Sequence, residues 1–215
     1  MPLIKELYNS NKPVEGKVYY TQYVVKVIGA NNKVEQESTV DMYLTNHQRQ
    51  IITEAIHLYV DSVYTLTIIP VSKTIVVNYL DNKTRAEYKK MATASLDSLF
   101  LSTMKQESCK YITGNAKYTK EVVLVAKDKS ASVKKVKYLI DEQKKVMYKM
   151  SMYAPDLISR MEYTYTIIDF DYKGKSISDH SVLDMAFKQD GSLLPQYKGY
   201  QVTDNRTKTS KNIKQ

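Results

Sequence analysis

The sequence contains few cysteines, glycines and prolines and no long apolar run, and each shortage excludes a class of structure. Cys109 is the single cysteine, so no disulfide can form within the chain and cysteine usage leaves the redox compartment open. The 6 glycines and 5 prolines are too few for a collagen-like or low-complexity chain, and they predict tight turns built mainly from Asn, Asp and Lys. No run approaches the roughly 20 apolar residues that a membrane-spanning helix needs.

Motifs with a defined chemistry are also missing. The patterns G-x-x-x-x-G-K, G-x-S-x-G and C-x-x-C do not occur, so nucleotide binding, serine hydrolysis and thiol redox chemistry have no support. The histidines His47, His57 and His180 lack the spacing of a metal-binding pair, and we interpret them as turn or surface residues. Asp169 and Asp171 could approach a Ca²⁺ ion, but without a glycine-rich loop we prefer a solvated strand end. The sequence therefore predicts no catalytic residue, metal site or cofactor, and we expect no enzyme.

The charge balance is strongly basic, with a formal net charge of +9. Clustered Lys and Arg side chains favour nucleic acid through counterion release, but here the basic residues are spread along the chain. Tyr19, Tyr20 and Tyr23 do lie near Lys17 and Lys26, as in a base-stacking surface. Tyrosine also covers sheet edges and lines amphipathic cavities, because its ring is apolar and its tip polar. We prefer that second interpretation and expect no nucleic-acid partner.

The abundant residues are strand formers. There are 19 tyrosines beside 3 phenylalanines and no tryptophan, together with many Val, Thr and Ile residues. Alternating polarity and turn residues predict strands over 17–28, 37–45, 49–54, 55–60, 63–69, 73–79, 122–125, 133–140, 145–153 and 161–170. The first of these is apolar on both faces, so we expect both faces to be covered. Short helical segments are expected at 6–8 and near 181–187.

A different pattern follows the sixth predicted strand. Apolar residues there recur every three or four positions, which predicts a helix over about 83–104. Its apolar stripe consists of Tyr88, Met91, Leu96, Leu99 and Met104. The predicted fold class is mainly β (α+β), a curved antiparallel sheet or unclosed β-barrel with this one main helix packed on its concave face. Leu99 and Met104 should then face strand residues such as Val24 and Val77.

The order of these elements resembles a known family. The hairpin series at 42–50, 58–66 and 73–77, with the closing segment 199–204, is similar in pattern and turn placement to the LolA/LolB-like lipoprotein-carrier superfamily, in its Bacteroidota periplasmic relatives. The resemblance covers roughly residues 17 to 204 and includes no invariant motif. It implies an unclosed antiparallel barrel whose concave face is plugged by helices, leaving an apolar cavity that accepts acyl chains.

The resemblance also implies a binding site. Its candidate ligand-binding residues are Val18, Tyr20, Val24, Met42, Leu44, Ile51, Ile75, Val77 and Leu99. An ordinary dry core would show the same pattern, because pockets are few in any protein. The predicted function is a non-enzymatic envelope protein that binds or carries an apolar ligand, a lipid or a lipoprotein acyl chain, in a half-barrel cavity. The alternative is a structural or adaptor protein of an envelope assembly, which would bind a protein partner through its edge strands.

The remaining expectations concern domains and location. We expect one LolA-like half-barrel domain over residues 1–205, followed by a mobile basic tail over 206–215. The first residues lack the apolar core of a signal peptide. The family resemblance favours a periplasmic protein whose signal peptide has been removed, and the sequence alone leaves a cytoplasmic location open.

Overall fold

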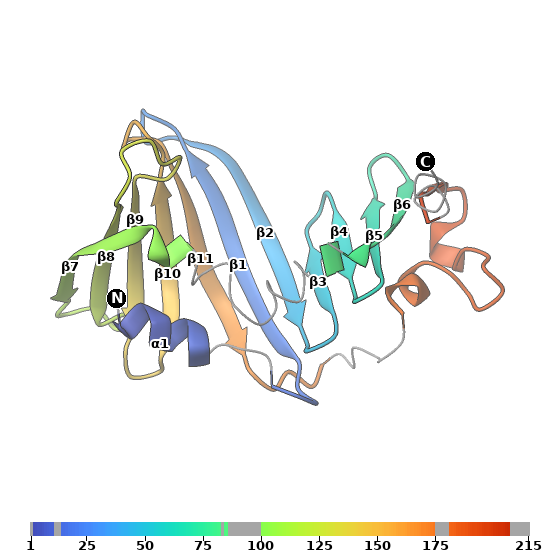
Figure 1. Ribbon diagram of the computed structural model, residues 1–215, viewed down its shortest axis with the longest axis horizontal. Helices are drawn as coiled ribbons and strands as arrows, with labels where there is room; N and C mark the ends of the chain where they lie inside the picture. The colour runs from blue at the N-terminus through green and yellow to red at the C-terminus, as the bar shows by residue number, and fades with distance from the viewer. Residues whose placement is uncertain (1, 11–13, 83, 86–99, 175–180, 207–215) are drawn as a thin grey trace. The chain divides into compact units, whose positions relative to one another are not determined.

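The computed structural model describes residues 2–10, 14–82, 84–85, 100–174 and 181–206 (Figure 1). The chain divides into two compact units. Unit 1 comprises Met1–Lys12, Thr21–Val40 and Ala94–Asp169, and unit 2 comprises Pro13–Tyr20, Asp41–Thr93 and Phe170–Gln215. Each unit has a hydrophobic core of its own. The single domain over 1–205 therefore stays a prediction, and residues 207–215 of the expected tail lie outside the described residues.

Twelve strands dominate the described residues. They are β1 (Tyr19–Ile28), β2 (Val34–Leu44), β3 (Arg49–Ile52), β4 (His57–Val60), β5 (Tyr64–Ile69), β6 (Thr74–Tyr79), β7 (Met104–Tyr111), β8 (Lys120–Ala126), β9 (Lys135–Asp141), β10 (Val146–Tyr153), β11 (Arg160–Asp169) and β12 (Gln201–Asp204). Their order is β12-β6-β5-β4-β3-β2-β1-β11-β10-β9-β8-β7. Neighbours from β2 to β6 and from β7 to β11 pair antiparallel, whereas β12 joins β6 in parallel. The predicted mainly antiparallel, open sheet is confirmed.

Two strands and one helix boundary differ from the sequence prediction. The strands β7 and β12 were not expected. Residues 83 and 86–99 of the predicted helix lie outside the described residues, while residues 84–85 and 100–102 are helical. Met104 begins β7, so the predicted helix end at 104 is two residues too late.

The core of unit 1 forms beneath the N-terminal helix α1 (Pro2–Ser10). Ile4 and Leu7, three positions apart on one side of α1, are fully buried. Burying each such side chain contributes about 1.5–3 kcal/mol. They join a cluster made of Leu101, Met104, Val122, Leu124, Val136, Tyr138, Ile140 and Met147. Figure 1 shows α1 lying across one face of the unit 1 strands. The short helix expected at 6–8 is therefore present and longer than predicted.

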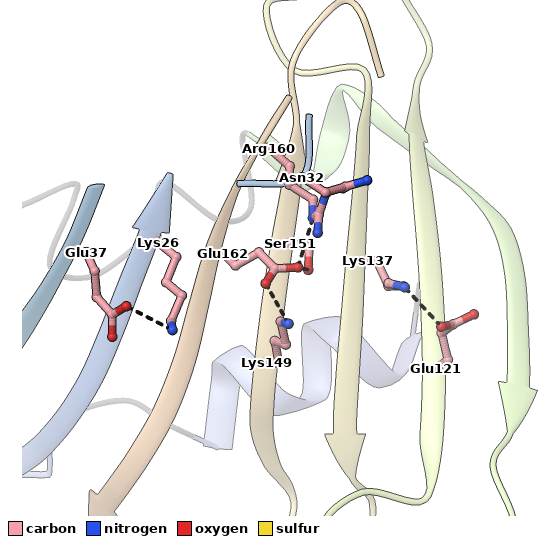
Figure 2. A network of polar contacts seen from close by, with 9 residues as sticks. All are labelled: Lys26, Asn32, Glu37, Glu121, Lys137, Lys149, Ser151, Arg160 and Glu162. Atoms are coloured by element: carbon pink, nitrogen blue, oxygen red, sulfur yellow. Dashed lines mark hydrogen bonds and ion pairs between the residues drawn. The ribbon is translucent and has the colours of Figure 1, made fainter. Parts of the chain in front are cut away.

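The other face of the unit 1 strands carries ion pairs (Figure 2). Three of them join neighbouring strands, namely Lys26–Glu37 at 2.9 Å, Lys149–Glu162 at 2.6 Å and Lys137–Glu121 at 3.6 Å, and a fourth, Arg160–Glu162 at 3.1 Å, lies within β11. Cross-strand pairs of opposite charge contribute roughly 0.2–1 kcal/mol each. The lysines within these strands therefore lie on a charged face, because charged side chains alternate there with core-facing apolar residues.

The core of unit 2 lies between β4–β6 and the short 3₁₀ helix η1 (Val182–Met185). Its strand residues are Tyr59, Leu66, Ile68, Ile75 and Val77, and Val182 and Ala186 cover them. A second 3₁₀ helix, η2 (Pro195–Tyr197), precedes β12. The prediction of a short helix near 181–187 is confirmed, as a single turn of 3₁₀ helix.

Candidate functional site

One face of unit 2 carries a row of apolar side chains that the core does not use. Successive residues of a strand point to opposite faces, so the buried Leu66 and Ile68 place Thr67 on the other face of β5. The strand registers then align one residue from each of five strands on that face. We call this the open row: Met42, Ile51, Leu58, Thr67 and Val76. Each of the five side chains is only half-buried.

The neighbouring row on the same face is more polar. It consists of Leu44, Arg49, Val60, Thr65 and Asn78, each aligned with the next. Asn78 Nδ2 donates to Thr65 Oγ1 at 3.4 Å. Arg49, on β3, is the charged residue of this row. The face is therefore apolar along one line and mixed in polarity beside it, where Leu44 and Val60 alternate with polar side chains.

The structure separates the nine predicted ligand-binding residues. Met42, Leu44 and Ile51 lie on the face of the open row. Ile75 and Val77 alternate with Val76, point to the opposite face, and are fully buried beneath η1. These five residues consequently do not line one common cavity.

Tyr20 lies in a cluster of tyrosines within unit 2. Its ring is 4.7 Å from that of Tyr43 and 4.5 Å from that of Tyr172, measured between centroids. Its hydroxyl donates to Asp41 Oδ1 at 2.6 Å. Burial, then the hydrogen bond to Asp41, raises the pKa of Tyr20, so the phenol stays protonated at neutral pH. Val18 is half-buried, and its carbonyl accepts from the Tyr172 amide at 2.9 Å. Both residues serve local packing here.

The last two predicted residues lie apart from these. Val24 belongs to unit 1 and is half-buried on the face of β1 that also carries Lys26. Leu99 lies outside the described residues. The expectation that Met104 faces Val77 is wrong, since Met104 packs in the core of unit 1 and Val77 in that of unit 2. The local periodicity of the sequence predicted that both residues are buried, but it could not indicate that they belong to two different cores.

A separate cavity of about 480 Å³ opens on unit 2. Its lining consists of His47, Gln48, Asp61, Ser62, Val63, Tyr64 and Ser181. Asp61 is 8% exposed. Its Oδ1 accepts from the amides of Val63 at 2.6 Å and Tyr64 at 2.7 Å, and its Oδ2 accepts from the amide of Val182 at 3.0 Å. The carboxylate thus fastens η1 to the turn between β4 and β5.

Sequence reasoning assigned Asp61 only to a turn. The bonds from Val63 and Tyr64 could be expected from the sequence, since an Asp side chain in a turn commonly accepts from the backbone amides two and three residues later. The bond to Val182 spans 121 residues and has no such signal. Because its oxygens accept from three backbone amides, Asp61 is a structural residue at the cavity.

The other chemically active side chains are dispersed. Among the described residues, no group of three or more His, Cys, Asp or Glu side chains could hold a metal ion. His47 is exposed in the β2–β3 turn, His57 is half-buried in β4, and Cys109 is exposed on β7. Burial raises the pKa of Tyr59 to about 12, so this phenol in the unit 2 core is neutral.

Comparisons with known proteins agree at the level of fold. An uncharacterized conserved protein from Thermus thermophilus matches 94% of this chain and 97% of its own, with a TM-score of 0.50 and 8% identity. A DUF1329 family protein from Desulfovibrio piger matches 81% and 92%, with a TM-score of 0.39 and 11% identity. A LolA superfamily protein from Nitrosomonas europaea matches 79% and 92%, with a TM-score of 0.34 and 8% identity.

The match to the Thermus thermophilus protein supports the fold of the chain. At these identities the similarity concerns the fold alone. No protein-family model matches the chain, and no curated protein matches its sequence. None of the helices in the described part of the chain is long and apolar enough to cross a membrane.

Proposed function

We propose that the chain is a non-enzymatic carrier of the cell envelope that binds an apolar ligand, such as the acyl chain of a lipid or lipoprotein, on the open row of unit 2. The observation that carries this proposal is the register of Met42, Ile51, Leu58 and Val76, which align across the strands without entering the core beneath η1. Covering their accessible apolar surface would contribute about 25 cal/mol per Å².

The dimensions of the open row suit such a ligand. Neighbouring strands lie about 4.8 Å apart, so the row from β2 to β6 spans roughly 19 Å. That is comparable to an extended long acyl chain. Thr67 presents a methyl group as well as a hydroxyl, so it interrupts the row only slightly. Arg49 lies in the neighbouring row near its β2 end and Asn78 at its β6 end, so a polar group would stand beside either end of the bound chain.

The edge strands fit the adaptor alternative less well. β7 ends the strand order, but its pairing is irregular between Gln106 and Ser108, and it carries Lys105, Glu107 and Lys110. Irregular pairing and charges on an edge oppose the addition of another strand. At the other end β12 is only 4 residues long. We therefore place ligand binding ahead of strand addition, and a periplasmic location accords with the family that the sequence resembles.

Titration with a fluorescent fatty acid tests the proposal. Leu58→Lys places a charge in the middle of the open row, and burying it under an acyl chain would cost several kcal/mol. We expect binding to weaken at least about tenfold, which corresponds to about 1.4 kcal/mol. The matched control is Val71→Lys, because Val71 is 91% exposed in the β5–β6 turn.

Two results would count against the proposal. One is a wild-type protein that binds no fatty acid at any accessible concentration. The other is a Leu58→Lys variant that folds and binds like the Val71→Lys control. Circular dichroism melting of both variants separates loss of binding from loss of the fold.

A further inference from the structure

Three hairpin turns lie together at one end of unit 1. They join β1 to β2 (residues 29–33), β8 to β9 (127–134) and β10 to β11 (154–159) (Figure 1). The Lys134 amide donates to the Tyr153 carbonyl at 3.0 Å, which links the second turn to the third. Arg160 Nη1 donates to Asn32 Oδ1 at 2.9 Å, which links the third to the first. We call this group of turns the tip surface.

The third turn holds two large apolar side chains in solvent. Leu157 is 53% exposed and Ile158 is 52% exposed. Leu157 also has φ of +59°, a left-handed conformation that costs a residue other than glycine about 1–2 kcal/mol. Asp156 fixes the turn, because its Oδ1 accepts from the Ile158 amide at 3.1 Å and from the Ser159 amide at 3.0 Å. An adjacent exposed Leu-Ile pair on a fixed, strained turn indicates an interaction site.

The same three turns carry lysines. The basic residues of the three turns are Lys33, Lys127, Lys129 and Lys134. Lys127 Nζ donates to the Ser102 carbonyl, and Lys134 Nζ donates to the Lys129 carbonyl, while the charge of Lys134 also interacts with the Asp128 carboxylate. Arg160, at the start of β11, pairs with Glu162.

The carboxylates of this region are Asp128, Asp156 and Glu35. Asp128 accepts from Ser130, Asp156 accepts from its own turn, and the Glu35 carboxylate lies close to Gly29. The tip surface is therefore slightly basic, and it belongs to a chain whose formal net charge is +9.

We infer that the tip surface docks on an anionic lipid bilayer, with Leu157 and Ile158 entering the boundary between headgroups and acyl chains. Basic residues contribute about 1 kcal/mol each near an anionic membrane surface. Lysine can also extend its ammonium to the headgroups while its stem lies along apolar surface. The tip is formed by the ends of hairpins, which suits insertion into a lipid surface. This inference rests on unit 1 and does not depend on the ligand proposed for unit 2.

A tryptophan reporter tests insertion directly. The chain contains no tryptophan, so Ile158→Trp gives a fluorescence signal without background. With vesicles of phosphatidylcholine and phosphatidylglycerol, we expect its emission to shift to the blue, and the shift to shrink with added salt. The matched reporter Val71→Trp, on the exposed β5–β6 turn of unit 2, should show no shift. Unshifted Ile158→Trp emission with these vesicles would overturn the inference.

A second variant distinguishes lipid binding from self-association of the chain. Leu157→Asn combined with Ile158→Ser removes both apolar side chains, and asparagine tolerates the left-handed conformation, so the fold should persist. We expect sedimentation with anionic vesicles to weaken at least about tenfold. Unchanged sedimentation would contradict the inference. So would a vesicle-free dimer of the wild-type chain that this double variant dissociates, because the tip surface would then be a contact between two copies.

Discussion

Replacing Asp61 by alanine should release η1 from unit 2. The Asp61 carboxylate accepts from three backbone amides, those of Val63, Tyr64 and Val182. Alanine accepts none of these bonds. The Val63 and Tyr64 amides belong to a turn that borders the open cavity, so water can partly replace their acceptor. Val182 is fully buried, and its amide would lose its acceptor in the core.

The magnitude follows from these three bonds. A hydrogen bond to a charged group contributes about 1.5–3 kcal/mol, and a buried amide without an acceptor costs about 1–3 kcal/mol. Allowing for water at the two turn amides, we expect Asp61→Ala to lower the free energy of unfolding by about 3 kcal/mol. That is a large share of the 5–15 kcal/mol typical of a folded protein.

Urea unfolding measures the total loss of unfolding free energy in Asp61→Ala, and hydrogen exchange shows which part of the chain is destabilised. Amide exchange should accelerate at residues 182–187 and in β5 and β6, whose core η1 covers, while the amides of β8 to β10 in unit 1 keep their protection. A loss below about 1 kcal/mol, or acceleration spread evenly over both units, would refute the assigned role of Asp61. Asp204→Ala is a suitable control, because Asp204 pairs only locally with Arg206.

Two further predictions concern the core of unit 2 and the ion pairs of unit 1. Ile75→Ala should lower the free energy of unfolding by about 2–5 kcal/mol in urea titrations, since Ile75 is fully buried. Ile51→Ala, on the half-buried face, should lower it clearly less. Equal losses of stability in the two variants would contradict the assignment of faces. For Glu162, burial opposes ionisation most strongly, but hydrogen bonds from Lys149 and Arg160 outweigh it and lower the pKa. Its ion pairs therefore add stability above the unfolded pKa of about 4.3, and this is lost as the pH falls through the lower folded pKa. Glu162→Gln should be about 1–2 kcal/mol less stable at pH 7, and the difference should shrink below about pH 4; a pH-independent difference would exclude this cause.

Most strands could be predicted because their signals are local. Alternation along β2 and the turn residues Pro70 to Lys73 between β5 and β6 lie within a few positions of one another. β7 was missed because only its first residue, Met104, is buried, so the strand shows no alternation of apolar residues. β12 was missed because it pairs in parallel with β6, 127 residues earlier in the chain, and no turn signal links the two.

The candidate site was predicted only in part, for a related reason. In β6 the residues Ile75, Val76 and Val77 are consecutive and apolar, so alternation cannot indicate which of them faces the core. η1 decides this by covering Ile75 and Val77, and η1 is fastened by Asp61 through a contact that is distant in sequence. Met42, Leu44 and Ile51 lie on a common face, which alternation and one hairpin turn determine locally.

Native mass spectrometry of the protein purified from the envelope of its own cells tests the central claim most directly. We predict a species whose mass exceeds that of the chain by one lipid or lipopeptide, and whose extra mass is lost from the Leu58→Lys variant but kept by Val71→Lys. A wild-type protein found only at the mass of the chain alone, under conditions that preserve other lipid complexes, would contradict the claim that unit 2 carries an apolar ligand.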